Sequence, residues 1–260
     1  MAKLDIQSNE QHIQIGRWNL SYLFFPCEES KRLIVCVGGR NYGYTGNIYE
    51  QQIGISNLLY LKDNAGPDGS RLWWLAYDGD FSVGKAYAEL IKKQAQECDV
   101  NIEDICYVGN CVGGFGGLYL SYMIGAGKVV AIAPYIAVGS AYENTPLLER
   151  IVGNPGIDLD DYIFDFFNCH SEVEAHIFIA NEDTMMKRSQ LSRFIDIMIK
   201  QKNLFVIKNF KITHPKETKV HSAIAYSIFS KEILNEFDQS LNRFYKYSPS
   251  KKTTSPGEEE

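Results

Sequence analysis

One stretch near the middle of the chain constrains the fold strongly, because it changes abruptly from a strand pattern to a helix pattern. Residues 105–109 are a short apolar run, β-branched at Ile105 and Val108, which is typical of a buried strand ending at Gly109. Small residues crowd the positions up to 117, and larger side chains then follow at helical spacing: Leu118, Tyr119, Tyr122 and Met123. The stretch therefore predicts a strand, a sharp turn and a helix in immediate succession.

Cys111 lies at the apex of this predicted turn, in the sequence Gly109-Asn110-Cys111-Val112-Gly113. This is the pattern Gly-x-nucleophile-x-Gly. The apex residue takes a strained backbone that holds its side chain clear of the sheet, and glycines flank it because a Cβ there would strike the neighbouring strand or helix. The N-terminus of the following helix favours a thiolate and supplies N–H donors. The pattern predicts that Cys111 is a nucleophile.

Two other interpretations of the same residues have to be weighed. The chain has six cysteines, at positions 27, 36, 98, 106, 111 and 169, and a free cysteine is more often a buried core residue than a catalyst. A glycine-rich turn before a helix can also bind phosphate, but the Lys and Ser/Thr of a P-loop do not follow here. The prediction for Cys111 depends on whether a base and an acid arrive beside it.

Strand-length and helix-length patterns alternate along most of the chain. Strands are predicted at residues 12–16, 19–25, 33–37, 71–77, 105–109, 128–133, 176–180 and 204–207. Helices are predicted at residues 49–61, 84–99, 190–199 and 222–244. The first two strands should form an antiparallel hairpin. The later alternation predicts an α/β fold with a mostly parallel, doubly wound sheet and right-handed crossovers.

The domain organisation follows from where this alternation breaks. From about residue 139 to 171 the rhythm is lost, and the segment is expected to form a short helical lid over a site. Beyond about residue 247 the composition is Ser, Lys, Thr, Pro, Gly and Glu, which predicts a disordered tail over 247–260. The sequence thus predicts a single domain over 1–246.

Composition excludes several classes of function. The net charge of −6 and the lack of a basic run argue against a nucleic-acid partner. The start Met-Ala-Lys-Leu-Asp has no apolar signal region, and no stretch reaches membrane-spanning length, so a cytoplasmic protein with no membrane partner is expected. The cysteines lack metal-site spacing, which predicts neither metal nor disulfide. A homo-oligomer is compatible with the sequence.

The positions of an acid and a base can be predicted from the order of the strands. After a nucleophile elbow, the acid follows a late strand and the base precedes the final helix. Asp183 follows the strand 176–180, and His221 directly precedes the helix predicted at 222–244. Glu182 could replace Asp183, which could instead cap a helix. His214 lies in the same loop as His221, but Pro215 constrains its backbone.

These motifs resemble the α/β-hydrolase superfamily over most of the chain, and the elbow is similar to the Gly-x-Cys-x-Gly-Gly of dienelactone hydrolases. The resemblance implies the α/β-hydrolase fold and a Cys111–His221–Asp183 triad. It also implies an oxyanion hole formed by the N–H of Val112 and of a residue in Gly39-Arg40. Most of the superfamily has serine at the apex, and outside the elbow no residue specifies the dienelactone family.

The triad implies an acyl-transfer enzyme that forms a covalent thioester, as an esterase, a thioesterase or an acyltransferase. The substrate would be a small-molecule acyl donor, with acyl-CoA or another thioester as one candidate, and the resemblance extends to transferases that acylate surface sugars. No cofactor is expected. Arg40, Asn41 and Asn110 are expected to contact substrate. The alternative is a catalytically silent α/β-hydrolase that acts as a binding or scaffold protein.

Overall fold

The computed structural model describes residues 6–39, 44, 53–141, 146–153, 157–168, 172–180, 191–201 and 205–210. The chain divides into the compact units Met1–Ala225 and Tyr226–Glu260, and every described residue belongs to the first. The helix predicted at 222–244 and the tail predicted at 247–260 lie outside the described residues.

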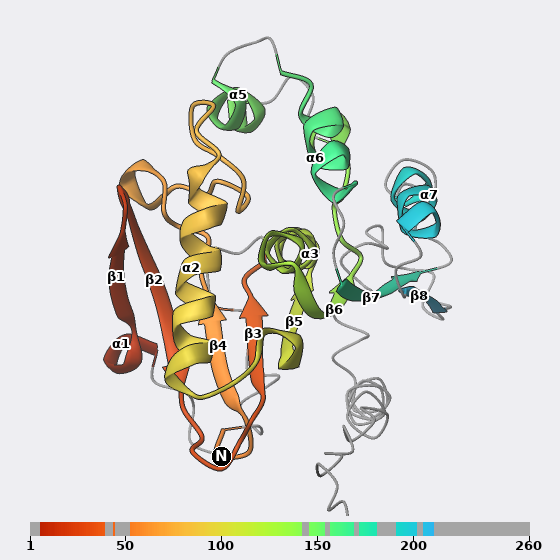
Figure 1. Cartoon of the computed structure of the whole chain (residues 1–260). Helices are drawn as coiled ribbons and strands as arrows, with labels where there is room; N and C mark the ends of the chain where they lie inside the picture. Colours follow the sequence, from red (N-terminus) through yellow and green to blue (C-terminus); the bar gives the residue numbers. More distant parts are fainter. Residues whose placement is uncertain are drawn as a thin grey trace, which may run out of the picture. The chain divides into compact units, whose positions relative to one another are not determined.

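An eight-stranded sheet in the order β1-β2-β4-β3-β5-β6-β7-β8 forms the centre of the first unit (Figure 1). The two strands of the N-terminal hairpin are antiparallel, and all strands from β3 to β8 are parallel. The strands are β1 (Gln11–Ile15), β2 (Trp18–Phe25), β3 (Leu33–Val37), β4 (Asn57–Leu61), β5 (Ile105–Asn110), β6 (Ala126–Ile132), β7 (Glu172–Ala180) and β8 (Phe205–Phe210).

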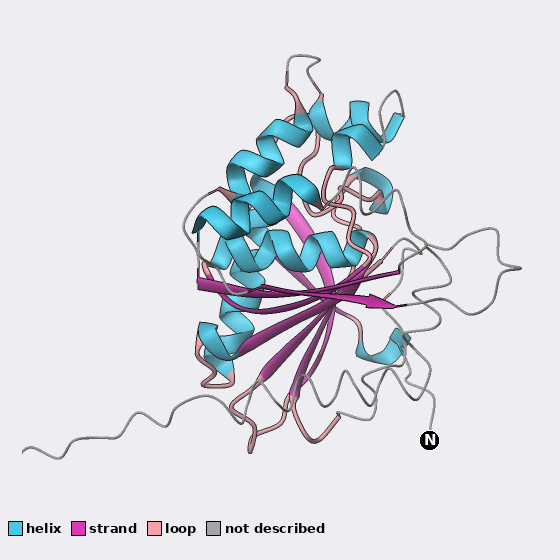
Figure 2. Ribbon diagram, turned by 90° about the vertical axis from the view of Figure 1, so that its right-hand side faces the viewer, coloured by secondary structure: helices cyan, strands magenta, loops and turns pink. Residues whose placement is uncertain are grey.

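Most of the described helices lie on one side of this sheet (Figure 2). They are α1 (Ile6–Asn9), α2 (Ser82–Glu97), α3 (Val112–Ile124), α4 (Val138–Ala141), α5 (Pro146–Val152), α6 (Leu159–Phe167) and α7 (Ser192–Gln201), with short 3-10 turns at η2 (Pro67–Gly69) and η3 (Ile102–Asp104). Helix α3 packs directly on the central strands, because the ideal Cβ of Gly117 would lie 3.5 Å from Val129 and 3.6 Å from Tyr107.

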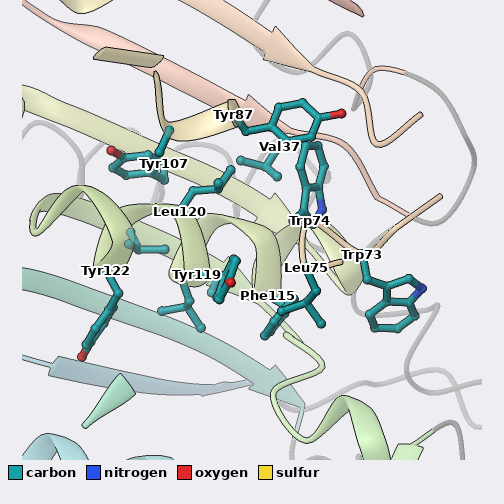
Figure 3. Packing of buried hydrophobic residues seen from close by; sticks show 14 of the residues in the cluster. Val37, Trp73, Trp74, Leu75, Tyr87, Tyr107, Phe115, Tyr119, Leu120 and Tyr122 are labelled. Carbon is teal, nitrogen blue, oxygen red and sulfur yellow. The ribbon is translucent and has the colours of Figure 1, made fainter. Parts of the chain in front are cut away.

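Aromatic side chains fill the space between the sheet and these helices (Figure 3). Trp74 packs edge-on against Tyr87 of α2, with ring centroids 4.8 Å apart. Phe166 of α6 packs against Tyr119 of α3, with the two ring centroids 4.6 Å apart. Helix α6, which falls in the segment 139–171 expected to form a lid, therefore packs against α3 through its apolar face.

Within the described residues, the predicted strands and the predicted strand–turn–helix agree with the structure except between residues 53 and 77. The hairpin, the parallel sheet and the strand–turn–helix elbow are all confirmed. The helix predicted at 49–61 is wrong at its C-terminal end, because residues 57–61 form the fully buried strand β4. Over so short an apolar run, periodicity does not separate a buried strand from a buried helix.

The strand predicted at 71–77 is also wrong, because these residues form turns beside the sheet. The N–H of Leu75 donates to the carbonyl of Leu72 at 3.0 Å. The N–H groups of Leu72 and Trp73 donate to the carboxylate of Asp63 rather than to a neighbouring strand. The Asp63 carboxylate therefore accepts the backbone hydrogen bonds that a neighbouring strand would otherwise accept. The apolar pattern of residues 71–77 does not reveal this buried partner.

The strand order places a topological switch point between β3 and β5. From β3 the chain moves outward to β4, and it then crosses back to β5 on the other side of β3. Loops at the carboxyl ends of strands diverge at such a point, and ligands of open α/β sheets bind there. The two loops that meet are those beginning at Gly38, after β3, and at Cys111, after β5.

Candidate active site

Cys111 forms a sharp turn between β5 and α3. Its backbone has φ 55° and ψ −117°, which is outside the regions that residues with a Cβ ordinarily adopt. Three hydrogen bonds hold it there. Its N–H donates to the carbonyl of Ile132 at 2.8 Å, and its carbonyl accepts from the N–H groups of Phe115 at 3.1 Å and Tyr135 at 3.4 Å. The strained elbow predicted at Cys111 is thus present, and the residue is half-buried.

The glycines on either side of the elbow are required by close backbone approach. An ideal Cβ on Gly109 would lie 2.2 Å from the carbonyl oxygen of Gly113. One on Gly113 would lie 2.3 Å from the carbonyl oxygen of Val37. Both distances are well inside van der Waals contact, so the first turn of α3 can lie against β3 and β5 only because these positions lack side chains.

The expected oxyanion-hole residues Val112 and Gly39 lie on the two loops that meet at the switch point. Val112 is the first residue of α3, and helix geometry leaves its N–H without an acceptor inside the helix. The ideal Cβ of Gly39 would lie 3.0 Å from Oδ1 of Asn110, so the loop after β3 contacts the residue preceding Cys111. The N–H of Gly38 donates to the carbonyl of Leu61 at 3.1 Å and ties the start of this loop to β4.

The loop after β3 is also tied to the sheet further along, at Tyr44. The hydroxyl of Tyr44 donates to Oε1 of Glu10 at 2.6 Å, and Nζ of Lys62 lies 3.3 Å from the same oxygen. Glu10 precedes β1 and Lys62 follows β4, so the contact lies at the carboxyl edge of the sheet, on the same side as Cys111.

The remaining predicted site residues lie outside the described part of the chain. They are Arg40 and Asn41 of the loop after β3, Asp183 with its alternative Glu182, and His221 with its alternative His214. Their assignment remains a prediction. Of the site residues predicted from the sequence, the structure brings together Cys111, Val112, Asn110 and Gly39.

A buried acid at this edge was not identified from the sequence. Asp63 follows β4 and is buried, and its carboxylate accepts from the N–H groups of Leu72 at 3.0 Å and Trp73 at 2.8 Å. Removal from water raises the pKa of Asp63 to about 6, against the effect of these N–H donors and of the Arg71 guanidinium. The signal is an acidic residue two positions after the apolar run 58–61, and the helix predicted over 49–61 conceals the strand that this run forms.

Three other cysteines have surroundings that disfavour a thiolate. Cys36 and Cys106 are fully buried on β3 and β5, and burial raises the pKa of both thiols, that of Cys106 to about 12. Burial also raises the pKa of Cys98. Cys111 is partly exposed at the start of a helix.

Among the described residues, the His, Cys, Asp and Glu side chains form no group of three or more that could hold a metal ion. No helix in the described part of the chain has both the length and the apolar character required to cross a membrane.

The sequence matches no protein-family model, and no curated protein matches it significantly. Solved structures do resemble it. The capsule O-acetyltransferase of Neisseria meningitidis serogroup A superposes with a TM-score of 0.65 at 14% identity, over 91% of this chain and 99% of that one. A point mutant of that acetyltransferase has also been solved in complex with CoA.

Two esterase-type structures are similar to the chain as well. An S-formylglutathione hydrolase from Agrobacterium tumefaciens gives a TM-score of 0.60 at 14% identity, over 90% of this chain and 94% of that one. Thermogutta terrifontis esterase 2 gives a TM-score of 0.60 at 13% identity, over 91% of this chain and 95% of that one. The sheet order, the switch point and these superpositions together show that the chain adopts the α/β-hydrolase fold, with Cys111 at the strained turn between β5 and α3.

Proposed function

We propose that the protein is an acyl-transfer enzyme whose nucleophile is Cys111. The observation that carries the proposal is the strained backbone of Cys111, fixed by three hydrogen bonds at the switch point of the sheet and at the N-terminus of α3. A half-buried residue on a turn of this kind is the placement expected of a nucleophile in this fold. Structural similarity to an O-acetyltransferase and to esterases supports the same class of chemistry.

The proposed reaction begins with attack by the Cys111 sulfur. His221 accepts the thiol proton and Asp183 holds the imidazole in the required tautomer. The sulfur forms a bond to the donor carbonyl carbon, and the resulting oxyanion accepts hydrogen bonds from the N–H of Val112 and of Gly39 or Arg40, each worth a few kcal/mol of barrier. The leaving group departs with the proton that His221 returns, which leaves an acyl thioester on Cys111.

The acyl group is then transferred from Cys111 to water or to an acceptor hydroxyl or amine, which regenerates the thiol. A thioester resists water better than it resists good nucleophiles, so the cysteine favours transfer over plain hydrolysis. Acyl-CoA is the proposed donor class, supported by the acetyltransferase that was solved with CoA. Arg40, Asn41 and Asn110 are proposed to contact the donor or the acceptor.

A donor and acceptor screen tests this proposal. Purified protein is incubated with acyl-CoAs and acyl p-nitrophenyl esters, with and without sugar and amine acceptors, and release of CoA or p-nitrophenol is followed. A transferase shows turnover that rises with the acceptor, and a hydrolase shows steady turnover in water alone. The Cys111→Ala variant is the matched control. Equal rates for Cys111→Ala and wild type would assign the release to another group and reject Cys111 as the nucleophile.

A further inference from the structure

Two consecutive tryptophans near the elbow adopt a backbone that suits neither of them. Trp73 has φ 56° and Trp74 has φ 65°, and together they form the centre of a turn closed by the Leu75 N–H and the Leu72 carbonyl at 3.0 Å. Glycine and asparagine are the usual residues at such positions. Bulky residues in this conformation are strained and persist only where the surroundings fix them.

The surroundings fix this turn from two sides. The carboxylate of buried Asp63 accepts from the N–H of Trp73 at 2.8 Å. The indole of Trp74 fits against α3, where an ideal Cβ on Gly116 would lie 2.4 Å from its Cδ1. Figure 3 shows the consequence for the two rings: Trp74 lies beside Tyr87, whereas Trp73 points away from that group.

Trp73 packs instead against Tyr135, the residue whose backbone contacts the nucleophile. The two ring centroids are 6.1 Å apart at an interplanar angle of 62°. The N–H of Tyr135 donates to the carbonyl of Cys111 at 3.4 Å. Trp73 is 1% exposed, whereas Tyr135 is half-buried. A buried indole thus packs against a partly exposed phenol ring, and the backbone of that tyrosine is hydrogen-bonded to Cys111.

We infer that the Tyr135 ring, supported by Trp73, forms one wall of the acyl site at Cys111 and limits the size of the acyl group that the thiol accepts. The inference rests on the proposed function. An acyl group on the Cys111 sulfur extends only a few ångströms from a backbone that Tyr135 contacts. The carboxylate of Asp63 holds the turn that carries Trp73, through the N–H groups of Leu72 and Trp73.

Alkylation of Cys111 by a small and a bulky reagent tests the wall without requiring catalysis. The alkylation rate of each cysteine is measured by peptide mapping, once with the small reagent iodoacetamide and once with the bulky reagent N-phenylmaleimide. The rate with N-phenylmaleimide divided by the rate with iodoacetamide is then compared among variants. Tyr135→Ala should raise this ratio at Cys111 by about tenfold or more, since a removed wall admits the larger group. Tyr135→Phe should leave the ratio unchanged, because the ring is retained.

The support from Trp73 predicts coupling between the two positions. Trp73→Ala should shift the ratio in the same direction as Tyr135→Ala, and the double variant should add little to Tyr135→Ala alone. Trp73→Leu, which removes the ring but leaves a smaller cavity, provides the same comparison if Trp73→Ala does not fold. Phe25→Ala is the matched control, because Phe25 is a half-buried aromatic at the opposite edge of the sheet.

Cys27, which also lies toward that opposite edge, reports general loosening in the same experiment. An unchanged ratio at Cys111 in Tyr135→Ala, or an equal rise at Cys27, would contradict the inference that the Tyr135 ring limits access to Cys111. Additive effects of Tyr135→Ala and Trp73→Ala would contradict the inference that Trp73 holds the Tyr135 ring in place. These outcomes are independent of turnover, so a protein that accepts no acyl donor but shows the predicted ratios would lose the proposed function and keep the steric wall.

Discussion

Cys111 illustrates how a single residue can signal a function through its backbone. Its φ of 55° and ψ of −117° cost about 1–3 kcal/mol for a residue with a Cβ. The hydrogen bonds from its N–H to Ile132 and from the Phe115 and Tyr135 N–H groups to its carbonyl offset that cost locally. A buried core cysteine would need none of these features, so the geometry favours the catalytic interpretation over core filling.

The reactivity of the Cys111 thiol should differ from that of the other cysteines. Cys111 should react with iodoacetamide at neutral pH faster than Cys98 or Cys106. It is partly exposed at a helix N-terminus, whereas burial raises the pKa of the other two thiols. Peptide mapping of a time course measures each rate. Labelling of Cys111 no faster than Cys98 would show that the elbow does not activate its thiol.

The second prediction at this scale concerns the pH dependence of stability at Asp63. Its folded-state pKa, about 6, lies above the unfolded value of about 3.9. The folded state therefore binds the Asp63 proton more tightly than the unfolded state does. The resulting contribution to the free energy of unfolding is complete below about pH 4 and is lost as the pH rises through about 6. Arg71 and Tyr87 are the ionisable neighbours.

Denaturant unfolding of wild type and Asp63→Asn at several pH values measures this effect. The unfolding free energy of wild type minus that of the variant should fall by roughly 2 kcal/mol between about pH 4 and about pH 7. The variant itself does not titrate at this position, so other carboxylates cancel in the difference. A difference that stays constant across the range would contradict the raised pKa.

At the scale of an element, helix α3 shows why one glycine is required and another is replaceable. The ideal Cβ of Gly113 would lie 2.3 Å from the Val37 carbonyl oxygen, whereas that of Gly117 meets only side chains at 3.5 Å or more. Gly113→Ala should therefore destabilise the fold by about 1–3 kcal/mol or more, because backbone must move. Gly117→Ala should be neutral or stabilise it by up to about 1 kcal/mol.

Thermal and denaturant unfolding of the two variants distinguish these effects. Both substitutions add the same methyl group within the same helix, so propensity alone would stabilise both. Equal stabilisation of Gly113→Ala and Gly117→Ala would mean that the first turn of α3 does not press against β3 as described.

The elements also show which parts of the fold could be predicted. The pattern Gly109-x-Cys111-x-Gly113 was sufficient for the elbow, because the conformation depends on local residues and on close backbone approach. Strand β4 and the turn at 71–77 were misassigned, because both depend on distant partners. β4 is a five-residue buried run, and the turn is fixed by Asp63, eight or more positions earlier in the chain.

At the scale of the whole molecule, the sheet order brings together the loops that follow β3 and β5. The alternation of strands and helices predicts parallel strands, and the switch point between β3 and β5 then places Gly39 beside Asn110. The contact between Trp73 and Tyr135 could not be predicted, because it joins loops after β4 and β6 whose backbones have positive φ at Trp73 and Ala133.

The base and the acid are predicted at this same scale, from strand order. His221→Ala should abolish turnover, and Asp183→Asn should reduce it severely because the imidazole loses its tautomer control. Both variants should unfold at the wild-type midpoint. His214→Ala is the matched control and should remain active. An inactive His214→Ala beside an active His221→Ala would assign the base to His214.

Intact mass spectrometry after mixing with an acyl donor provides the decisive measurement. Wild-type protein treated with acyl-CoAs or acyl p-nitrophenyl esters should gain the mass of one acyl group, located on Cys111 by peptide mapping and discharged by the right acceptor. Cys111→Ser should hold a more persistent ester, and Cys111→Ala should gain no mass while its unfolding midpoint stays near that of wild type. If no donor ever adds mass to the wild-type protein, and Cys111→Ala binds its physiological partner normally, the protein is a binding or scaffold protein rather than an acyl-transfer enzyme.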